Sequence, residues 1–284
     1  MRLFQRRPIV PVLRLSGAIG MAMPLRPGLS ITTIAPVLER AFRMSKTPAV
    51  AIVINSPGGS PVQSHLIFQR LRSLAKEHEK KIYVFCEDVC ASGGYFIAVA
   101  GDEIHADPSS IVGSIGVVTA GFGFTKLIEN IGVERRIYTS GERKAALDPF
   151  SPEKPEEIER LKVLQRDVHA SFIGIVRERR GQKLVGSDDD LFSGEFWSGP
   201  KARELGLIDG ISDVRTKMRE IYGDKVLLPV VSGGRGWLRR RILSEQLPFS
   251  LRGALGDQEP RSFSLSTDIL STLEARALWA RFGL

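Results

Sequence analysis

Short apolar runs alternate with segments of helical periodicity through most of this chain. Residues 8–15 and 50–55 are rich in valine and isoleucine, and residues 31–42 between them place apolar side chains at helical spacing. Residues 62–74 repeat the helical pattern, and residues 81–86 repeat the strand pattern. Because this alternation is typical of strand, helix, strand units, we predict an α/β fold with a mainly parallel sheet covered by helices.

The same rhythm continues in the second half of the chain. Residues 103–106 and 115–119 are expected to be short strands, and the uncharged, glycine-rich residues 109–125 are expected to form buried strand and loop. Residues 152–180 are highly charged but place apolar side chains at steps of three and four, which predicts a long amphipathic helix. Such a helix can pack on the sheet alone or contact a neighbouring subunit as well.

Ser92 lies between small residues in the run Cys90-Ala-Ser-Gly-Gly-Tyr95, where a strand is expected to turn into a helix. A serine at such a turn can present its hydroxyl, and the amide that follows it can point at the carbonyl oxygen under attack. An earlier strand ends in Asn55-Ser-Pro-Gly-Gly59, whose glycines allow a close backbone approach. Because sites in parallel sheets gather at the carboxyl ends of strands, the two turns should face one crevice and form an acyl-transfer site.

A serine nucleophile needs a base to take its proton, and the sequence offers two kinds of residue. The histidines lie in contexts without a recognisable base motif: His65, His78, His105 and His169. Lys144, which ends the run Ser140-Gly-Glu-Arg-Lys144, is the alternative. A solvated lysine with a pKa near 10.4 is neutral only about 0.04% of the time at pH 7, so a lysine base requires a dry pocket.

Composition and charge exclude some classes of protein. The chain has 284 residues, of which 43% are hydrophobic and 25% charged, and this excludes wholesale disorder. The net charge of +8 is scattered along the chain, so charge alone selects no partner, and no nucleic acid is expected. Cys86 and Cys90 do not resemble a disulfide framework, which favours a reducing, cytoplasmic location.

The sequence predicts no membrane anchor. The uncharged run at residues 15–25 is far shorter than the roughly 20 residues of a spanning helix. Residues 233–284 hold eight arginines against five acids and begin with a glycine-rich linker. We interpret them as a basic extension, partly helical or disordered, and peripheral membrane contact through it stays an open interpretation.

Five ordered motifs between about residue 10 and residue 225 resemble those of the signal peptide peptidase A family. They are Asn55-Ser-Pro-Gly-Gly59 with Ser64, Ala91-Ser-Gly-Gly-Tyr95, Gly113-Ser-Ile-Gly-Val117, Ser140-Gly-Glu-Arg-Lys144 and Trp197-Ser-Gly-Pro-Lys-Ala-Arg-Glu-Leu-Gly-Leu-Ile-Asp209. Five motifs in order are far more specific than any one of them. The run Lys144-Ala-Ala-Leu-Asp148 departs from the family pattern, in which an aspartate often follows the lysine directly.

The resemblance implies roles for individual residues. Ser92 would be the nucleophile and Lys144 the general base. Ser114 would hydrogen-bond the lysine and orient it. Gly58 and Gly93 would supply the two backbone amides that hold the oxyanion.

The resemblance also implies a Clp protease/crotonase-like fold for residues 1–232 and a ring-like homo-oligomer, in which neighbouring subunits complete the substrate groove. The substrates would be peptides or unfolded protein segments, including signal-peptide remnants. The chemistry needs no cofactor and no metal; a zinc site built from Cys86, Cys90 and His105 lacks a second paired motif. Two alternatives stay open: a crotonase-like acyl-CoA enzyme with Ser92 as a bystander, and a non-catalytic scaffold of the same fold.

Overall fold

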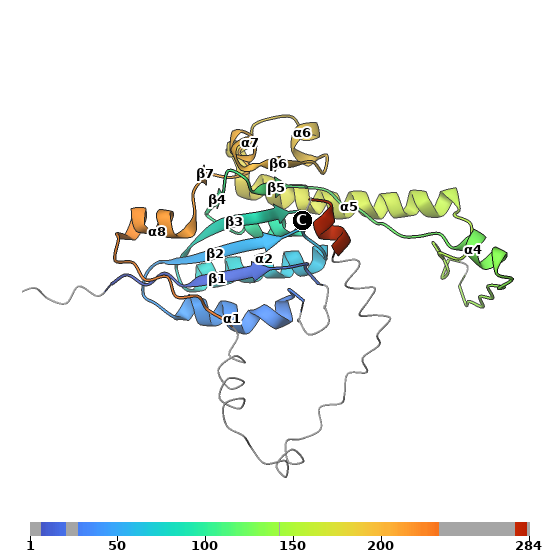
Figure 1. Ribbon diagram of the computed structural model, residues 1–284, viewed down its shortest axis with the longest axis horizontal. Helices are drawn as coiled ribbons and strands as arrows, with labels where there is room; N and C mark the ends of the chain where they lie inside the picture. Colours follow the sequence, from blue (N-terminus) through green and yellow to red (C-terminus); the bar gives the residue numbers. More distant parts are fainter. Residues whose placement is uncertain (1–6, 21–27, 142, 233–275, 283–284) are drawn as a thin grey trace, which may run out of the picture.

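The computed structural model describes residues 7–20, 28–141, 143–232 and 276–282, and their strands form one seven-stranded sheet (Figure 1). The strands are β1 (Val12–Ser16), β2 (Ala49–Ser56), β3 (Lys81–Ala91), β4 (Glu103–Ala106), β5 (Ile111–Gly113), β6 (Phe196–Ser198) and β7 (Gly210–Ile211). They follow the order β1-β2-β3-β4-β7 with parallel pairing, while β5 pairs parallel with the far end of β3 and antiparallel with β6. The predicted α/β fold with a mainly parallel sheet is confirmed.

The helices begin and end at residues suited to those positions. They are α1 (Ile31–Arg43), α2 (Pro61–Glu77), α3 (Gly93–Ala98), α4 (Thr125–Asn130), α5 (Pro155–Arg180), α6 (Asp188–Phe192), α7 (Gly199–Glu204) and α8 (Val214–Tyr222), with a 3₁₀ turn at Gly181–Lys183. Ser30 caps α1 in a reciprocal hydrogen-bonded box with Thr33. Proline occupies the first position of α2 and of α5, where its missing N–H costs nothing.

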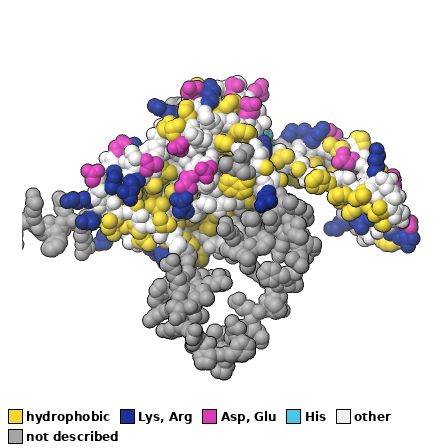
Figure 2. Space-filling model, in the orientation of Figure 1, with side chains coloured by type: hydrophobic (Ala, Val, Ile, Leu, Met, Phe, Trp, Pro, Cys, Tyr) yellow, Lys and Arg dark blue, Asp and Glu magenta, His cyan; other side chains and the backbone are white. Residues whose placement is uncertain are grey.

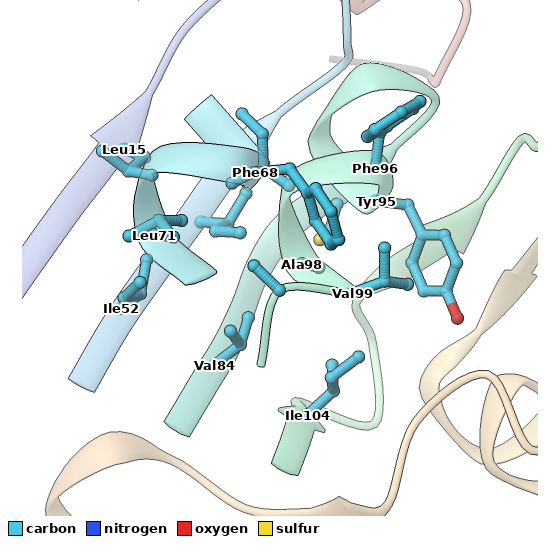
Figure 3. Close-up of a cluster of buried hydrophobic side chains, with 14 of the residues drawn as sticks. Leu15, Ile52, Phe68, Leu71, Val84, Tyr95, Phe96, Ala98, Val99 and Ile104 are labelled. Atoms are coloured by element: carbon cyan, nitrogen blue, oxygen red, sulfur yellow. The ribbon is translucent and has the colours of Figure 1, made fainter. Parts of the chain in front are cut away.

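Both faces of the sheet are buried, which explains why the strands read as continuous apolar runs. On β2, Val50, Ile52 and Ile54 join the main hydrophobic cluster with α1, α2, α3 and α5. Ala49, Ala51 and Val53 alternate with them and join a second cluster that includes Met218 of α8. Figure 3 shows side chains of α2 and α3 gathered against β2 and β3 in the main cluster.

Most of the predicted elements are confirmed, and one strand is wrong. The helices expected over residues 31–42, 62–74 and 152–180 are α1, α2 and α5, with boundaries shifted by at most three residues. The strand expected at residues 115–119 is absent from the described chain. The sheet strand in this region is β5, which ends two residues earlier, at Gly113. Residues 109–125 are only partly buried: Val118 and Phe122 are exposed, so the expectation of a buried loop is wrong over its second half.

Residues 118–141 and 143–150, which we call the arm, leave the sheet and run out along α5 (Figure 1). The side chain of Gln165 on α5 donates a hydrogen bond to Thr119 Oγ1 at 3.0 Å. Farther out, Phe124 N donates to Pro149 O at 2.6 Å, and Leu147 N donates to a Glu157 carboxylate oxygen at 2.9 Å. The arm is therefore held by its own backbone and by α5, and most of its side chains stay exposed.

A buried ion pair ties the end of α5 to the turn before β7. Arg180, whose side chain is 2% exposed, donates to Asp209 Oδ2 at 2.9 Å and to Gly206 O at 2.9 Å. Asp209 also accepts hydrogen bonds from Lys183 Nζ and Ile104 N, both at 2.7 Å. Burial alone would raise the pKa of Asp209, but the hydrogen bonds from Arg180 and Lys183 lower it on balance.

Asp209→Asn is expected to lower the free energy of unfolding at pH 7 by about 3–5 kcal/mol, because it leaves the Arg180 charge buried and unpaired. The folded-state pKa of Asp209 lies below the usual value of 3.8, so the pair stabilises the fold above that pH and the stabilisation is lost as the pH falls through the folded pKa. Urea unfolding should therefore show the two proteins converging in acid. An exposed control, Asp189→Asn, should change little; equal stability of Asp209→Asn and wild type at pH 7 would contradict this account.

The predicted basic extension, residues 233–284, lies largely outside the described residues. Residues 276–282 are described, and residues 276–280 of them are helical. Among the helices that the structure describes, none has the combination of length and apolarity that crossing a bilayer demands.

Candidate active site

Ser92 is the first residue after β3 and the N-cap of α3, which confirms the predicted strand-to-helix turn. Its backbone has φ 52° and ψ −122°, a conformation that side-chain-bearing residues rarely adopt. Two hydrogen bonds hold it: Ser92 N donates to Gly113 O at 2.8 Å, and Phe96 N donates to Ser92 O at 2.9 Å. These bonds fix the backbone of the serine, which is half-buried.

The loop after β2 lies directly against Ser92. A Cβ built at Gly58, whose φ is +103°, would lie 2.7 Å from Ser92 Cβ and 3.0 Å from Ser92 Oγ. Ile19 N donates to Gly58 O at 2.8 Å, and Ser60 N donates to Ile19 O at 2.9 Å, so the segment that follows β1 forms an isolated parallel bridge with the loop. The two glycine-rich turns therefore lie against each other, as the prediction that they share one site requires.

Gly93 is packed as tightly as Gly58. A Cβ built there would lie 2.5 Å from Ser64 Oγ and 3.4 Å from Gly58 Cα. Ser64 is fully buried on α2 and donates to Ser60 O at 2.9 Å. Ser64 thus occupies the space that a side chain at residue 93 would need.

The two proposed oxyanion amides differ in their present hydrogen bonding. Gly93 is the first residue of α3, and the amides of a first helical turn have no partner within the helix. Gly58 N donates to Ser56 Oγ at 3.2 Å, and the same hydroxyl donates to Gly17 O at 2.7 Å. The sequence analysis did not predict that the Ser56 hydroxyl would accept a hydrogen bond from the Gly58 amide. The only available signal was the position of Ser56 within the motif, next to Asn55.

Ser114 lies one residue beyond the carbonyl that holds Ser92. Its side chain is 2% exposed, its φ is +52°, and its amide donates to Glu195 O at 2.6 Å, next to β6. Gly113, which accepts the Ser92 amide, thereby places Ser114 beside the nucleophile turn.

Lys144 lies in a turn of the arm and is exposed, with its amide donating to Gly141 O at 3.2 Å. The structure thus brings Ser92, Gly58 and Gly93 together, with Ser114 adjacent, and leaves Lys144 on the arm. The single chain does not supply the dry pocket that a lysine base requires.

Other titratable side chains near the turn are engaged in packing. Burial raises the pKa of the Cys90 thiol well above its usual value, so this thiol stays protonated and unreactive. The His65 ring lies 5.7 Å from that of Phe96, and the His105 ring stacks on Phe85 at 5.5 Å. Within the described part of the chain, His, Cys, Asp and Glu side chains do not gather in threes as a metal site would require.

Comparison with known proteins gives the chain a family. The model of peptidase family S49 matches residues 74–226. The chain is 55% identical over 97% of its length to a Brucella abortus protein named Na(+)/H(+) antiporter NhaA, 32% identical over 72% to the Arabidopsis thaliana chloroplastic serine protease SPPA, and 35% identical over 63% to Haemophilus influenzae protease 4. It spans 37%, 31% and 29% of these relatives, respectively. The chain belongs to peptidase family S49, the signal peptide peptidase A family, and has the ClpP/crotonase-like fold of that family.

Proposed function

We propose that the chain is a serine endopeptidase that works through an acyl-enzyme. Ser92 Oγ attacks a peptide carbonyl carbon while the neutral amine of Lys144 takes the hydroxyl proton. The amides of Gly58 and Gly93 hold the negative charge on the carbonyl oxygen, and the departing amine receives the proton from the lysine. Water then attacks the ester, and the acid is released.

One observation carries this proposal: the backbone of Gly58 lies against Ser92 with no room for a side chain. A tight, glycine-built approach on one side of a strained serine is what an oxyanion site demands, and a turn with only a structural role does not require it. The Gly58 amide now donates to Ser56 Oγ at 3.2 Å, a long hydrogen bond that a charged oxygen can replace. The names of the Arabidopsis and Haemophilus relatives, both proteases, support the same reaction class.

The exposure of Lys144 supports a site that is completed by a second copy of the chain. A lysine in water stays protonated near neutral pH, so the amine needs a pocket that this chain alone does not give it. The arm that carries Lys144 also exposes large apolar side chains: Val118, Phe122, Leu127, Ile131, Val133, Ile137, Tyr138 and Leu147 (Figure 2). We propose that the arm docks on a neighbouring copy in a ring-like homo-oligomer and brings Lys144 to that copy's Ser92, with Ser114 orienting the amine.

Phe122→Asp combined with Ile131→Asp is expected to break the assembly, because the two substitutions place charges on the exposed apolar surface of the arm. Light scattering after size-exclusion chromatography should report a smaller particle, and acylation of Ser92 should fall at least about tenfold while circular dichroism stays unchanged. Glu129→Ala, on the same arm, is the matched control and should keep the wild-type mass. An unchanged mass for the double variant would contradict the proposed contact.

The reaction class is tested by labelling with a fluorophosphonate and mapping the modified side chain by mass spectrometry. We expect the label on Ser92, with none on the Ser92→Ala chain, together with hydrolysis of apolar peptides and unfolded segments. A crotonase-like acyl-CoA enzyme would share the glycine turns but would not need Ser92. Turnover of an acyl-CoA that survives Ser92→Ala, without peptide hydrolysis, would therefore replace this proposal with the alternative.

A further inference from the structure

An apolar patch borders the nucleophile turn on the face of the sheet away from α3. It is formed by Val89 and Ala91 of β3, both fully buried, and by Ile111 of β5. Val89 pairs with Ile111 across the two strands, and two residues farther along β3 Ala91 pairs with Gly113. We call these three residues, together with Phe196 of β6, the aromatic-docking patch.

The patch is coupled to Ser92 through the backbone. Ala91 directly precedes Ser92, and the carbonyl of Gly113, the partner of Ala91, accepts the Ser92 amide at 2.8 Å. Phe196 pairs with Gly113 on its other side, so the patch continues onto β6. Whatever fills the patch therefore sits within one residue of the nucleophile along the strand.

Residues 276–282 of the chain itself cover the patch. Phe282 is 8% exposed and packs in one cluster with Val89 and Ala91, and Trp279 packs against the same cluster. The Phe282 ring meets the Phe196 ring edge to face, with centroids 5.1 Å apart. In Figure 1 this segment, drawn in red, lies beside the carboxyl ends of the central strands.

The fit depends on shape and apolarity and not on a particular sequence. Strands β3 and β5 offer small and β-branched side chains and β6 offers the Phe196 ring, while the segment offers two aromatic rings three residues apart. Other residues of the segment, such as Arg276 and Ala280, are exposed. Any peptide with aromatic or bulky apolar side chains at that spacing presents the same surface.

We propose that the aromatic-docking patch is an exchangeable binding surface for aromatic peptide segments, occupied in this chain by residues 276–282. The consequence for catalysis rests on the proposed peptidase function: peptide substrates with aromatic side chains would compete with residues 276–282 for the patch. The apparent affinity for such a peptide is then reduced by the fraction of molecules in which the segment is docked.

The test first measures binding without catalysis, in chains that carry Ser92→Ala. A fluorescein-labelled peptide with the sequence of residues 274–284 is titrated against this chain and against the same chain with Trp279→Ala and Phe282→Ala. Freeing the patch should tighten binding by roughly tenfold or more, as measured by fluorescence anisotropy. Adding Phe196→Ala to the freed chain should remove most of that gain, whereas the control Arg276→Ala should bind like the parent chain.

Turnover is measured next, in chains that keep Ser92. Trp279→Ala with Phe282→Ala should lower KM for an aromatic peptide, leave kcat within about twofold, and leave fluorophosphonate labelling of Ser92 unchanged. Phe282→Leu, a milder variant that keeps an apolar side chain, should give an intermediate KM.

Equal peptide binding by the covered and freed chains, or binding of a control peptide whose Trp and Phe are both replaced by Ala, would overturn the proposal. So would a fall of labelling in parallel with thermal stability, since that result assigns the segment a structural role alone. The binding measurement needs no catalysis. A chain that binds the peptide but never hydrolyses peptides would therefore refute the peptidase function and leave the proposed binding surface intact.

Discussion

Lys144→Ala and Lys144→Arg chains are expected to acylate Ser92 about 10⁴-fold more slowly than wild type, the upper range for loss of a general base. Alanine removes the amine, and arginine keeps a positive charge but cannot release its proton in a protein. Because Lys144 is exposed in the single chain, neither change should disturb folding. The measurement is the rate of fluorophosphonate labelling of Ser92 at several pH values, with circular dichroism and particle mass recorded alongside.

The pH dependence adds a second readout to the lysine variants. Only the neutral amine can accept the serine proton, so wild-type acylation should rise from neutral toward alkaline pH. Lys126→Arg, at an exposed lysine on the same arm, is the matched control and should follow the wild-type curve. Wild-type turnover by Lys144→Arg would show that another group is the base.

Gly58→Ala is expected to reduce acylation by about 10²–10³-fold, the usual effect of losing one oxyanion donor. The added Cβ would lie 2.7 Å from Ser92 Cβ and 2.9 Å from Gly93 N, and the φ of +103° is a conformation that alanine rarely adopts. The loop must therefore move away from the serine, and its amide must move with it. Labelling kinetics and thermal unfolding should both be measured, because we also expect a lower melting temperature.

Gly121→Ala provides the control for the glycine substitution. A Cβ at residue 121 meets nothing within 4 Å, so this variant should keep its fold and its rate. If Gly58→Ala labelled Ser92 at the wild-type rate, the Gly58 amide would have no part in holding the oxyanion.

The part of the site that lies on the sheet could be predicted from the sequence, because local patterns and a topological rule determine it. Glycine-rich turns after two strands of a parallel sheet had to meet at one edge, and the contact between Gly58 and Ser92 confirms this. The continuous apolar run over residues 50–55 likewise predicted a strand of a sheet covered by helices, and β2 is buried on both faces. In each case neighbours along the chain carry the information.

The features that the sequence did not predict depend on contacts between distant residues or on other molecules. The glycine-rich run at residues 109–125 looks like a buried loop, since apolar composition does not distinguish a core residue from one such as Phe122 that is exposed in the single chain. The pairing of Arg180 with Asp209 joins the end of the long helix to the last residue of a motif, and periodicity does not report such a pair. The packing of Phe282 beside Ala91 spans most of the chain and follows no local rule.

The most direct test of the central claim mixes two inactive chains. Ser92→Ala and Lys144→Ala are each expected to be inactive as homo-oligomers, the first for want of a nucleophile and the second for want of a base. If Lys144 of one copy activates Ser92 of its neighbour, subunits dissociated and reassembled together should recover a substantial fraction of wild-type peptide hydrolysis, with label only on the Lys144→Ala chains. Mixed assemblies of wild-type mass that remain as inactive as either parent would contradict the account.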